Sequence, residues 1–275
     1  MTIRMRNTFA LGSFFFSAAA VITVGLSLAW AIVTGNLAPP PPSLLPLASA
    51  SREGIFGFNF TAVLGAAAFS ALSAPVLTLS IFLNFEKTKS QECVYCIAFF
   101  LSCLSEGVRL LIPVFNLWDA NTALLNGAAR VMFFGRLMAA LSFFTCAVTL
   151  VNTQYRESGK YFIILVCSAA FFSAIIPVNT LRLLPNCTVQ AGFTRVTAVC
   201  QTILFLLTVF AFLFVTKSYE KKDALILTLG YVLFFSGYRV LTVADSFFFA
   251  ALGALCFIAG MRIYLGTVHK IYMWK

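Results

Sequence analysis

Charged residues occur inside segments of this sequence that are otherwise almost entirely apolar. One such segment contains four polar residues at spacings i, i+3, i+4 and i+7, namely Ser102, Ser105, Glu106 and Arg109. On an α-helix these spacings place the four side chains along one face. A charge in the middle of a bilayer costs about 2.5–3.5 kcal/mol even on the mildest scale, so it needs a partner or water. The spacing therefore predicts a polar stripe that faces the interior of a helix bundle.

Arginines outnumber carboxylates in the half of the chain that we expect to face outward. All eight lysines lie in expected cytoplasmic segments, whereas seven of the eleven arginines do not: Arg52, Arg109, Arg130, Arg136, Arg182, Arg195 and Arg239. The acids on the outward side are Glu53, Glu106, Asp119 and Asp245. Because guanidinium stays charged and binds carboxylate or phosphate in a bidentate manner, this excess predicts an anion site open to the exterior or lumen. The candidate ligand-binding residues are Glu106, Arg109, Arg130, Arg136, Arg195 and Arg239.

A structural interpretation of the same arginines stays open. Arg130, Arg195 and Arg239 can instead extend to lipid headgroups, while Glu106 neutralises one internal arginine for assembly of the bundle. Glu106 lies nine residues before the outer end of its segment, and Arg136 lies nine residues after the outer start of the next. In an antiparallel hairpin the two are at similar depth, so we expect an ion pair between Glu106 and Arg136.

Residues for metal or nucleophilic chemistry are sparse. Cys93-x-x-Cys96 is not accompanied by a second pair, and the single histidine, His269, lies near the C-terminus. Glu106 is the only acid well inside an apolar segment, so paired catalytic carboxylates are missing. The sequence predicts no catalytic residue, no metal and no cofactor, although an enzyme acting on a lipid phosphate stays an alternative.

The elements that must position these residues are membrane-spanning helices. The chain has 275 residues, 61% hydrophobic and 10% charged, with a mean hydropathy of +0.95, which excludes a soluble fold. We expect an all-α transmembrane bundle of about eight spans: Phe9–Thr34, Phe58–Leu83, Val94–Phe115, Gly127–Val151, Tyr161–Leu181, Val196–Val215, Ala224–Leu241 and Ser246–Leu265. The last two are the least distinct, since one of them is open to a re-entrant or strongly tilted interpretation.

Lysine and arginine also set the orientation. With both termini in the cytoplasm, twelve of the nineteen basic residues fall on the cytoplasmic side, among them Arg6, Lys221 and Lys270. The net charge of +10 then reflects topology and contact with anionic lipids, and nucleic acid is not expected as a partner. The expected partners are membrane lipids, an anionic small molecule, and a membrane or cytoplasmic protein.

Two units follow from the chain's organisation. Residues 1–57 hold the first span and an external proline-rich loop, and residues 58–275 hold the other seven helices. An alternative is cleavage of the first span at the small residues Leu47–Ala50. The apolar run is far longer than a signal peptide requires, so we expect the span to be retained.

Five short segments carry a resemblance to a known family: Ser51–Phe58, Val114–Asn116, Phe171–Ala174, Asn186-Cys187 and Gly192. They resemble the six-span family of the DRAM autophagy modulators and the proteins that remodel the lipid of GPI anchors. The resemblance covers roughly residues 9–215, the last two spans have no counterpart, and no functional residue can be carried over. It implies an endomembrane protein, of Golgi or lysosome, that handles lipids or anchors; otherwise the plasma membrane is expected.

The residues support several classes of function. The first is a multi-pass protein that binds an anion or lipid headgroup from the outer side, as a sensor, a transporter or a lipid-handling protein. The alternatives are a structural subunit of a membrane complex, and an intramembrane enzyme in which arginines hold a phosphate while Glu106 acts as acid or base.

Overall fold

The computed structural model describes residues 3–45, 54–86, 90, 92–118, 123–151, 158–177, 182–190, 192–214 and 221–273. Its long helices are α1 (Ile3–Val33), α3 (Phe60–Phe85), α4 (Glu92–Ser105), α6 (Ala123–Val151), α7 (Ser158–Ile175), α8 (Thr194–Phe214), α9 (Lys221–Val243) and α10 (Phe247–Met273). The short elements are η1 (Pro42–Leu44), η2 (Gly54–Phe56), η3 (Glu106–Leu110), α5 (Leu111–Val114), β1 (Arg182–Leu183) and β2 (Val189–Gln190). The predicted cleavage site Leu47–Ala50, and Arg52, Glu53 and Asp119, lie outside the described residues.

The protein is an all-α bundle that fits a multi-pass membrane protein. In the part described, seven helical segments are long and apolar enough to cross a membrane, with α4, η3 and α5 counted as one. The eighth apolar helix, α7, has 18 residues and is about 27 Å long, slightly less than the hydrocarbon core. Within the fifth predicted span, Tyr161–Leu181, α7 ends at Ile175, since Pro177 cannot donate a backbone hydrogen bond; residues 178–181 lie outside the described ranges.

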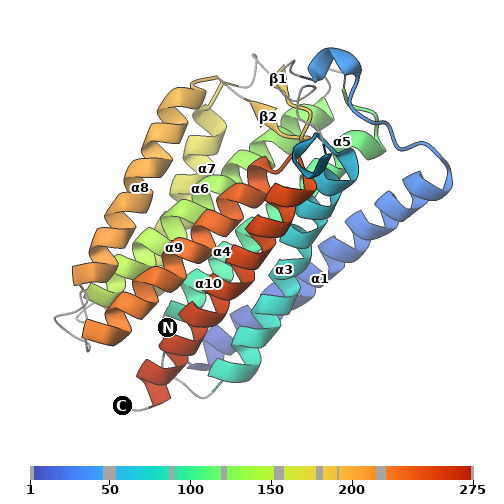
Figure 1. Ribbon diagram of the computed structural model, residues 1–275. Helices are drawn as coiled ribbons and strands as arrows, with labels where there is room; N and C mark the ends of the chain where they lie inside the picture. The colour runs from blue at the N-terminus through green and yellow to red at the C-terminus, as the bar shows by residue number, and fades with distance from the viewer. Residues whose placement is uncertain are drawn as a thin grey trace.

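The two ends of the bundle are distinct (Figure 1). The start of α1 and the end of α10 lie at one end, and α5 and the β1–β2 hairpin lie at the other, which we call the hairpin end. The antiparallel hairpin pairs Arg182 with Gln190 and Leu183 with Val189, and the sequence had not predicted it. The charge distribution predicts that the hairpin end faces away from the cytoplasm.

The α4–η3–α5 segment is the central helix of the bundle. In an apolar stretch of 18 residues within this segment, 72% of the residues are buried, against 11% in the corresponding stretch of α1 and 17% in that of α8. The predicted polar stripe is confirmed as internal, since Ser102, Ser105, Glu106 and Arg109 are all buried. The third predicted span, Val94–Phe115, corresponds to the helical segment Glu92–Val114, within which residues 106–110 form a 3₁₀ helix. Pro113 has no N–H for the carbonyl of Arg109, and the Leu111 N–H bonds to Val108 and Arg109 instead.

Small residues bring two pairs of helices into close contact. On α6, the small residues Gly135, Ala139, Ser142 and Cys146 are buried, and a methyl group at Gly135 would overlap the side chain of Ser105. On α3, the small residues Ala66 and Ser70 are buried, while Ser73 and Ser80 line a groove.

The last two helices are each long and apolar enough to cross a membrane, which argues against the re-entrant alternative. α9 has 23 residues and α10 has 27, and they form the most extensive helix contact in the described part. Gly230 and Gly237 of α9 face α10, and Gly253 and Gly260 of α10 face α9. These pairs are each seven residues apart, which keeps them on one side of a helix.

Candidate functional site

Glu106 is the centre of a buried charge cluster near the hairpin end. Its carboxylate accepts hydrogen bonds from Arg136 Nε at 2.8 Å and Nη2 at 3.1 Å, which confirms the predicted ion pair as a bidentate one. Arg109 Nη1 lies 3.5 Å from the other side of the same carboxylate, and the Tyr238 hydroxyl donates to it at 3.4 Å. The 3₁₀ turn brings Arg109 to Glu106, because residues three apart eclipse one another in that helix.

Arg109 joins three parts of the molecule. It is fully buried, and it donates to the carbonyl of Asn186 in the hairpin at 2.6 Å and to that of Leu241 in α9 at 3.3 Å. The side-chain oxygen of Asn186 in turn accepts from the backbone and hydroxyl of Thr188, which holds the turn of the hairpin. Arg109 therefore fastens the hairpin over the end of the bundle and does not line the cavity described below.

Cys187 occupies the left-handed region of the backbone in this turn, with φ of 57°, and it is buried. Burial raises the pKa of its thiol to about 12, and the nearby Arg109 offsets only part of that increase. At pH 8 only about one thiol in ten thousand is then ionised, and the thiolate is the reactive form.

We therefore expect wild-type Cys187 to react with a membrane-impermeant maleimide at least 100-fold more slowly than a cysteine introduced at Leu184, which is 37% exposed in the same loop. Peptide mapping by mass spectrometry measures both rates. Arg109→Gln should release the hairpin and raise the rate at Cys187. Equal rates at the two positions in the wild-type background would contradict the closed hairpin.

A polar cavity of about 190 Å³ lies beside the charge cluster. Two of the predicted residues, Arg136 and Arg239, line it, together with residues of the hairpin, α6, α8 and α9. Among the described residues its lining includes no carboxylate; the polar members are Asn186, Thr188, Gln190, Thr194, Thr197, Gln201 and Thr242. The cavity reaches the surface at Leu184 and Val243, which are 37% and 62% exposed.

Both cavity arginines keep hydrogen-bond donors that the described protein leaves unused. Arg136 uses Nε and Nη2 for Glu106, and its Nη1 makes no hydrogen bond to a described residue. Arg239 donates through Nη1 to the Gln201 side chain at 2.6 Å, and within the described ranges its other N–H groups have no partner. Two guanidinium groups with spare donors therefore meet in one recess.

The other two predicted arginines lie apart from the cavity. Arg130 is exposed and donates to the carbonyls of Ala174 at 2.8 Å and Ser173 at 3.4 Å, at the C-terminal end of α7. A cation there stabilises the carbonyl end of a helix. Arg195 is exposed in the first turn of α8, and the structure gives it no hydrogen bond or ion pair with another described residue. For these two residues, the structural interpretation suits the geometry better.

Sequence reasoning missed the polar residues that complete the cavity. Thr194, Thr197 and Gln201 lie at i, i+3 and i+7 on α8, which is the pattern that had identified the stripe on the third span. Tyr238, which donates to Glu106, precedes the predicted residue Arg239 in the sequence but was not itself predicted. The hairpin residues carried no comparable signal.

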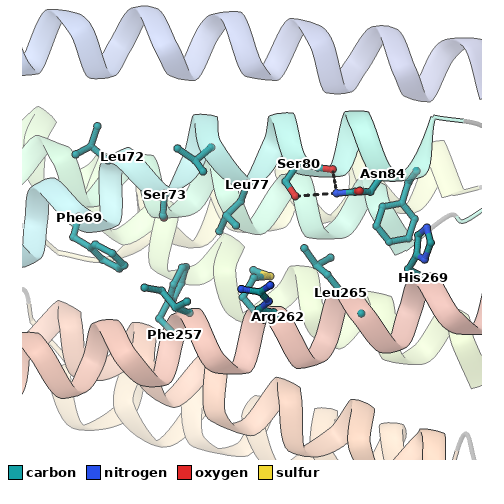
Figure 2. Close-up of a pocket in the computed structure, with 15 residues that line it drawn as sticks. Phe69, Leu72, Ser73, Leu77, Ser80, Asn84, Phe257, Arg262, Leu265 and His269 are labelled. Carbon is teal, nitrogen blue, oxygen red and sulfur yellow. Dashed lines mark hydrogen bonds between the residues drawn. The ribbon is translucent and has the colours of Figure 1, made fainter.

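A larger groove lies between α3 and α10, with a volume of about 680 Å³ (Figure 2). Its walls are mainly apolar, and Arg262 lies between side chains such as Leu77 and Leu265. Asn84 and His269 lie at the same end of the groove. It holds one arginine where the polar cavity holds two, and Arg262 is exposed. The groove therefore suits an anion less well than the polar cavity does.

No family model matches this sequence. The chain is 28% identical over 143 residues to an uncharacterized protein of Treponema pallidum (strain Nichols). The match covers 52% of this chain and 40% of that relative's length. A partial match to an uncharacterized protein carries no activity to this chain.

Proposed function

We propose that this membrane protein binds an oxyanion, such as a phosphate or carboxylate group, in the cavity that Arg136 and Arg239 line. The observation that carries the proposal is the pair of guanidinium groups with unused donors in a polar recess without a lining carboxylate. Arginine binds such groups through two parallel hydrogen bonds, so the spare N–H groups suit a tetrahedral or planar oxyanion.

The local charge favours an anionic guest. Arg109, Arg136 and Arg239 surround or adjoin the single carboxylate of Glu106, which leaves two positive charges without a partner in the cluster. Charges removed from water are costly unless they are paired, and a bound anion would supply one such partner. Pockets for larger small molecules enclose about 300–1,000 Å³, so a cavity of about 190 Å³ suits a single anionic group rather than a nucleotide.

The geometry of this site favours binding alone over catalysis or transport. Glu106 is fully buried, bonded to Arg136 through both oxygens and absent from the cavity lining, so its role is to position Arg136 rather than to act as acid or base. On the far side of the cluster, the rings of Phe99, Phe143 and Phe234 pack with centroids 4.5–5.1 Å apart. This buried aromatic layer favours a binding role, as in a sensor, over a transport path.

The resemblance to the DRAM and GPI-anchor group stays a prediction. If it holds, the hairpin end would face the lumen of an endomembrane compartment, and the anionic group would belong to a lipid or anchor. A plasma-membrane location would place the same cavity at the cell exterior.

Thermal unfolding of the purified protein in a non-ionic detergent tests the proposal. Against chloride at equal ionic strength, saturating phosphate should raise Tm by roughly 5 °C, because a ligand that binds only the folded state stabilises it. Arg239→Gln should abolish the increase, and Arg262→Gln, which removes an arginine from the other groove, should retain it. An equal increase in wild type and Arg239→Gln would contradict the proposal.

A further inference from the structure

A second cavity adjoins the polar one. It has a volume of about 300 Å³, and it lies between α8 and α9 with Gln201, Thr202, Phe205, Phe235, Ser236, Arg239 and Val240 around it. Gln201 and Arg239 line both cavities. Their hydrogen bond, at 2.6 Å, therefore lies on the boundary between the two spaces.

The two cavities lie one after the other along the axes of α8 and α9, which is the direction of depth in a membrane. On α8 the polar cavity runs from Thr194 to Gln201, about 10 Å along the helix axis, and the second cavity continues about 6 Å further to Phe205. α9 runs in the opposite direction, so on this helix the polar cavity is lined by Thr242 and Arg239 and the second cavity by Arg239 and the earlier residue Phe235. Toward the middle of the helices, the phenyl rings of Phe205 and Phe235 thus join the walls, beside the hydroxyls of Thr202 and Ser236.

The second cavity is open toward the expected lipid phase. Thr202 and Ser236 are exposed, and α8 buries only Gln201, Thr208 and Phe212 within the bundle. The stacked rings of Phe205 and Phe235, with centroids 5.5 Å apart, form an apolar wall next to a charged group. A free ion would make no favourable contact with these rings, whereas an acyl chain attached to an anionic headgroup would fill the space.

We infer that the natural occupant is an amphiphile: a single-chain or two-chain lipid whose phosphate lies between Arg136 and Arg239 and whose chain leaves between α8 and α9. This inference rests on the proposed oxyanion site and chooses a lipid over a free ion as the source of the anion. The lipid belongs to the leaflet at the hairpin end, because its head and chain then have the same order of depth as the two cavities.

Affinities for lysophosphatidate and for inorganic phosphate, measured by thermal unfolding in one detergent, test this inference. Val240→Phe places a ring in the path of the chain. It should weaken lysophosphatidate binding roughly tenfold, the size of a typical overpacking penalty, while phosphate binding is unchanged. Leu229→Phe, at an apolar α9 position that is 54% exposed and outside both cavities, should change neither affinity. Comparison between variants in the same detergent cancels the partitioning of the lipid into micelles.

The outcomes separate this inference from the proposed function. If Val240→Phe fails to fold, Ser236→Leu narrows the same space from an exposed position and should have the same selective effect. Unchanged lysophosphatidate binding in both variants, with phosphate binding intact, would overturn the amphiphile and leave the oxyanion site. A wild-type protein that binds neither phosphate nor lysophosphatidate would overturn both.

Discussion

Replacement of Glu106 by glutamine should lower the free energy of unfolding by about 3–5 kcal/mol, the cost of removing one partner from a buried ion pair. Glutamine keeps the size of the side chain and loses its charge, so Arg109 and Arg136 are left buried side by side without a counter-ion. The fall in stability is measurable by unfolding the purified protein in mixed micelles of a non-ionic detergent and dodecyl sulfate. The double variant Glu106→Gln with Arg136→Gln should cost less than the sum of the single variants, since the two side chains act as one unit.

The matched control is the ion pair between Lys270 and Asp223. Its atoms are 2.9 Å apart, but the lysine side chain is 59% exposed and the pair lies at the opposite end of the bundle. Asp223→Asn should therefore cost no more than about 1 kcal/mol. A Glu106→Gln variant as stable as Asp223→Asn would show that the cluster is hydrated or neutral, which would contradict a dry ion pair between Glu106 and Arg136.

Gly260→Ala should destabilise the contact between α9 and α10 by about 2–3 kcal/mol. An added methyl group would lie closer than 3.0 Å to the backbone nitrogen and the Cα of Phe234. Backbone atoms cannot rotate away as a side chain does, so the two helices must separate, and the buried contacts of Tyr238 and Phe257 would loosen with them. The same micelle unfolding assay measures the effect.

Gly266→Ala on the same helix provides the control, since nothing lies within 4 Å of a methyl group there. It should be neutral or slightly stabilising, because alanine favours a helix over glycine by up to about 1 kcal/mol. Equal effects at Gly260 and Gly266 would mean that the two helices are not in close contact at Gly260.

Much of the architecture could be predicted from hydropathy and charge. Spans are recognisable because lipid requires long apolar helices, and the structure moves most of their boundaries by only a few residues. The pair of Glu106 and Arg136 was predictable because equal distances from a shared turn give equal depth in an antiparallel hairpin. The depth of a residue in the membrane follows from the number of residues between it and the end of its span, so it can be counted in the sequence.

Which neighbouring helix each face of a span meets cannot be counted in this way. Arg130 and Arg136 belong to the same predicted site, yet one caps α7 and the other faces Glu106 and the cavity. Which neighbour each side meets depends on packing across several helices, including the glycine contacts of α9 and α10. The contact of the hairpin with Arg109 also depends on a partner that is distant in the sequence.

Arg6 illustrates the same limit at the other end of the bundle. It was counted only as a cytoplasmic charge, but the structure buries it and directs its guanidinium to the carbonyls of Phe85 at 2.6 Å and Ser90 at 3.2 Å. Arg6 thus caps the C-terminal end of α3, in addition to the topological role that the charge distribution predicts. Composition alone does not separate these two roles.

The most direct test of the oxyanion site is to locate a heavy oxyanion in the folded protein. Crystals or cryo-EM samples prepared with selenate should show a strong peak between the guanidinium groups of Arg136 and Arg239, and Arg239→Gln should remove it. A cavity that stays empty at saturating selenate, with peaks only at exposed arginines such as Arg195, would contradict the site.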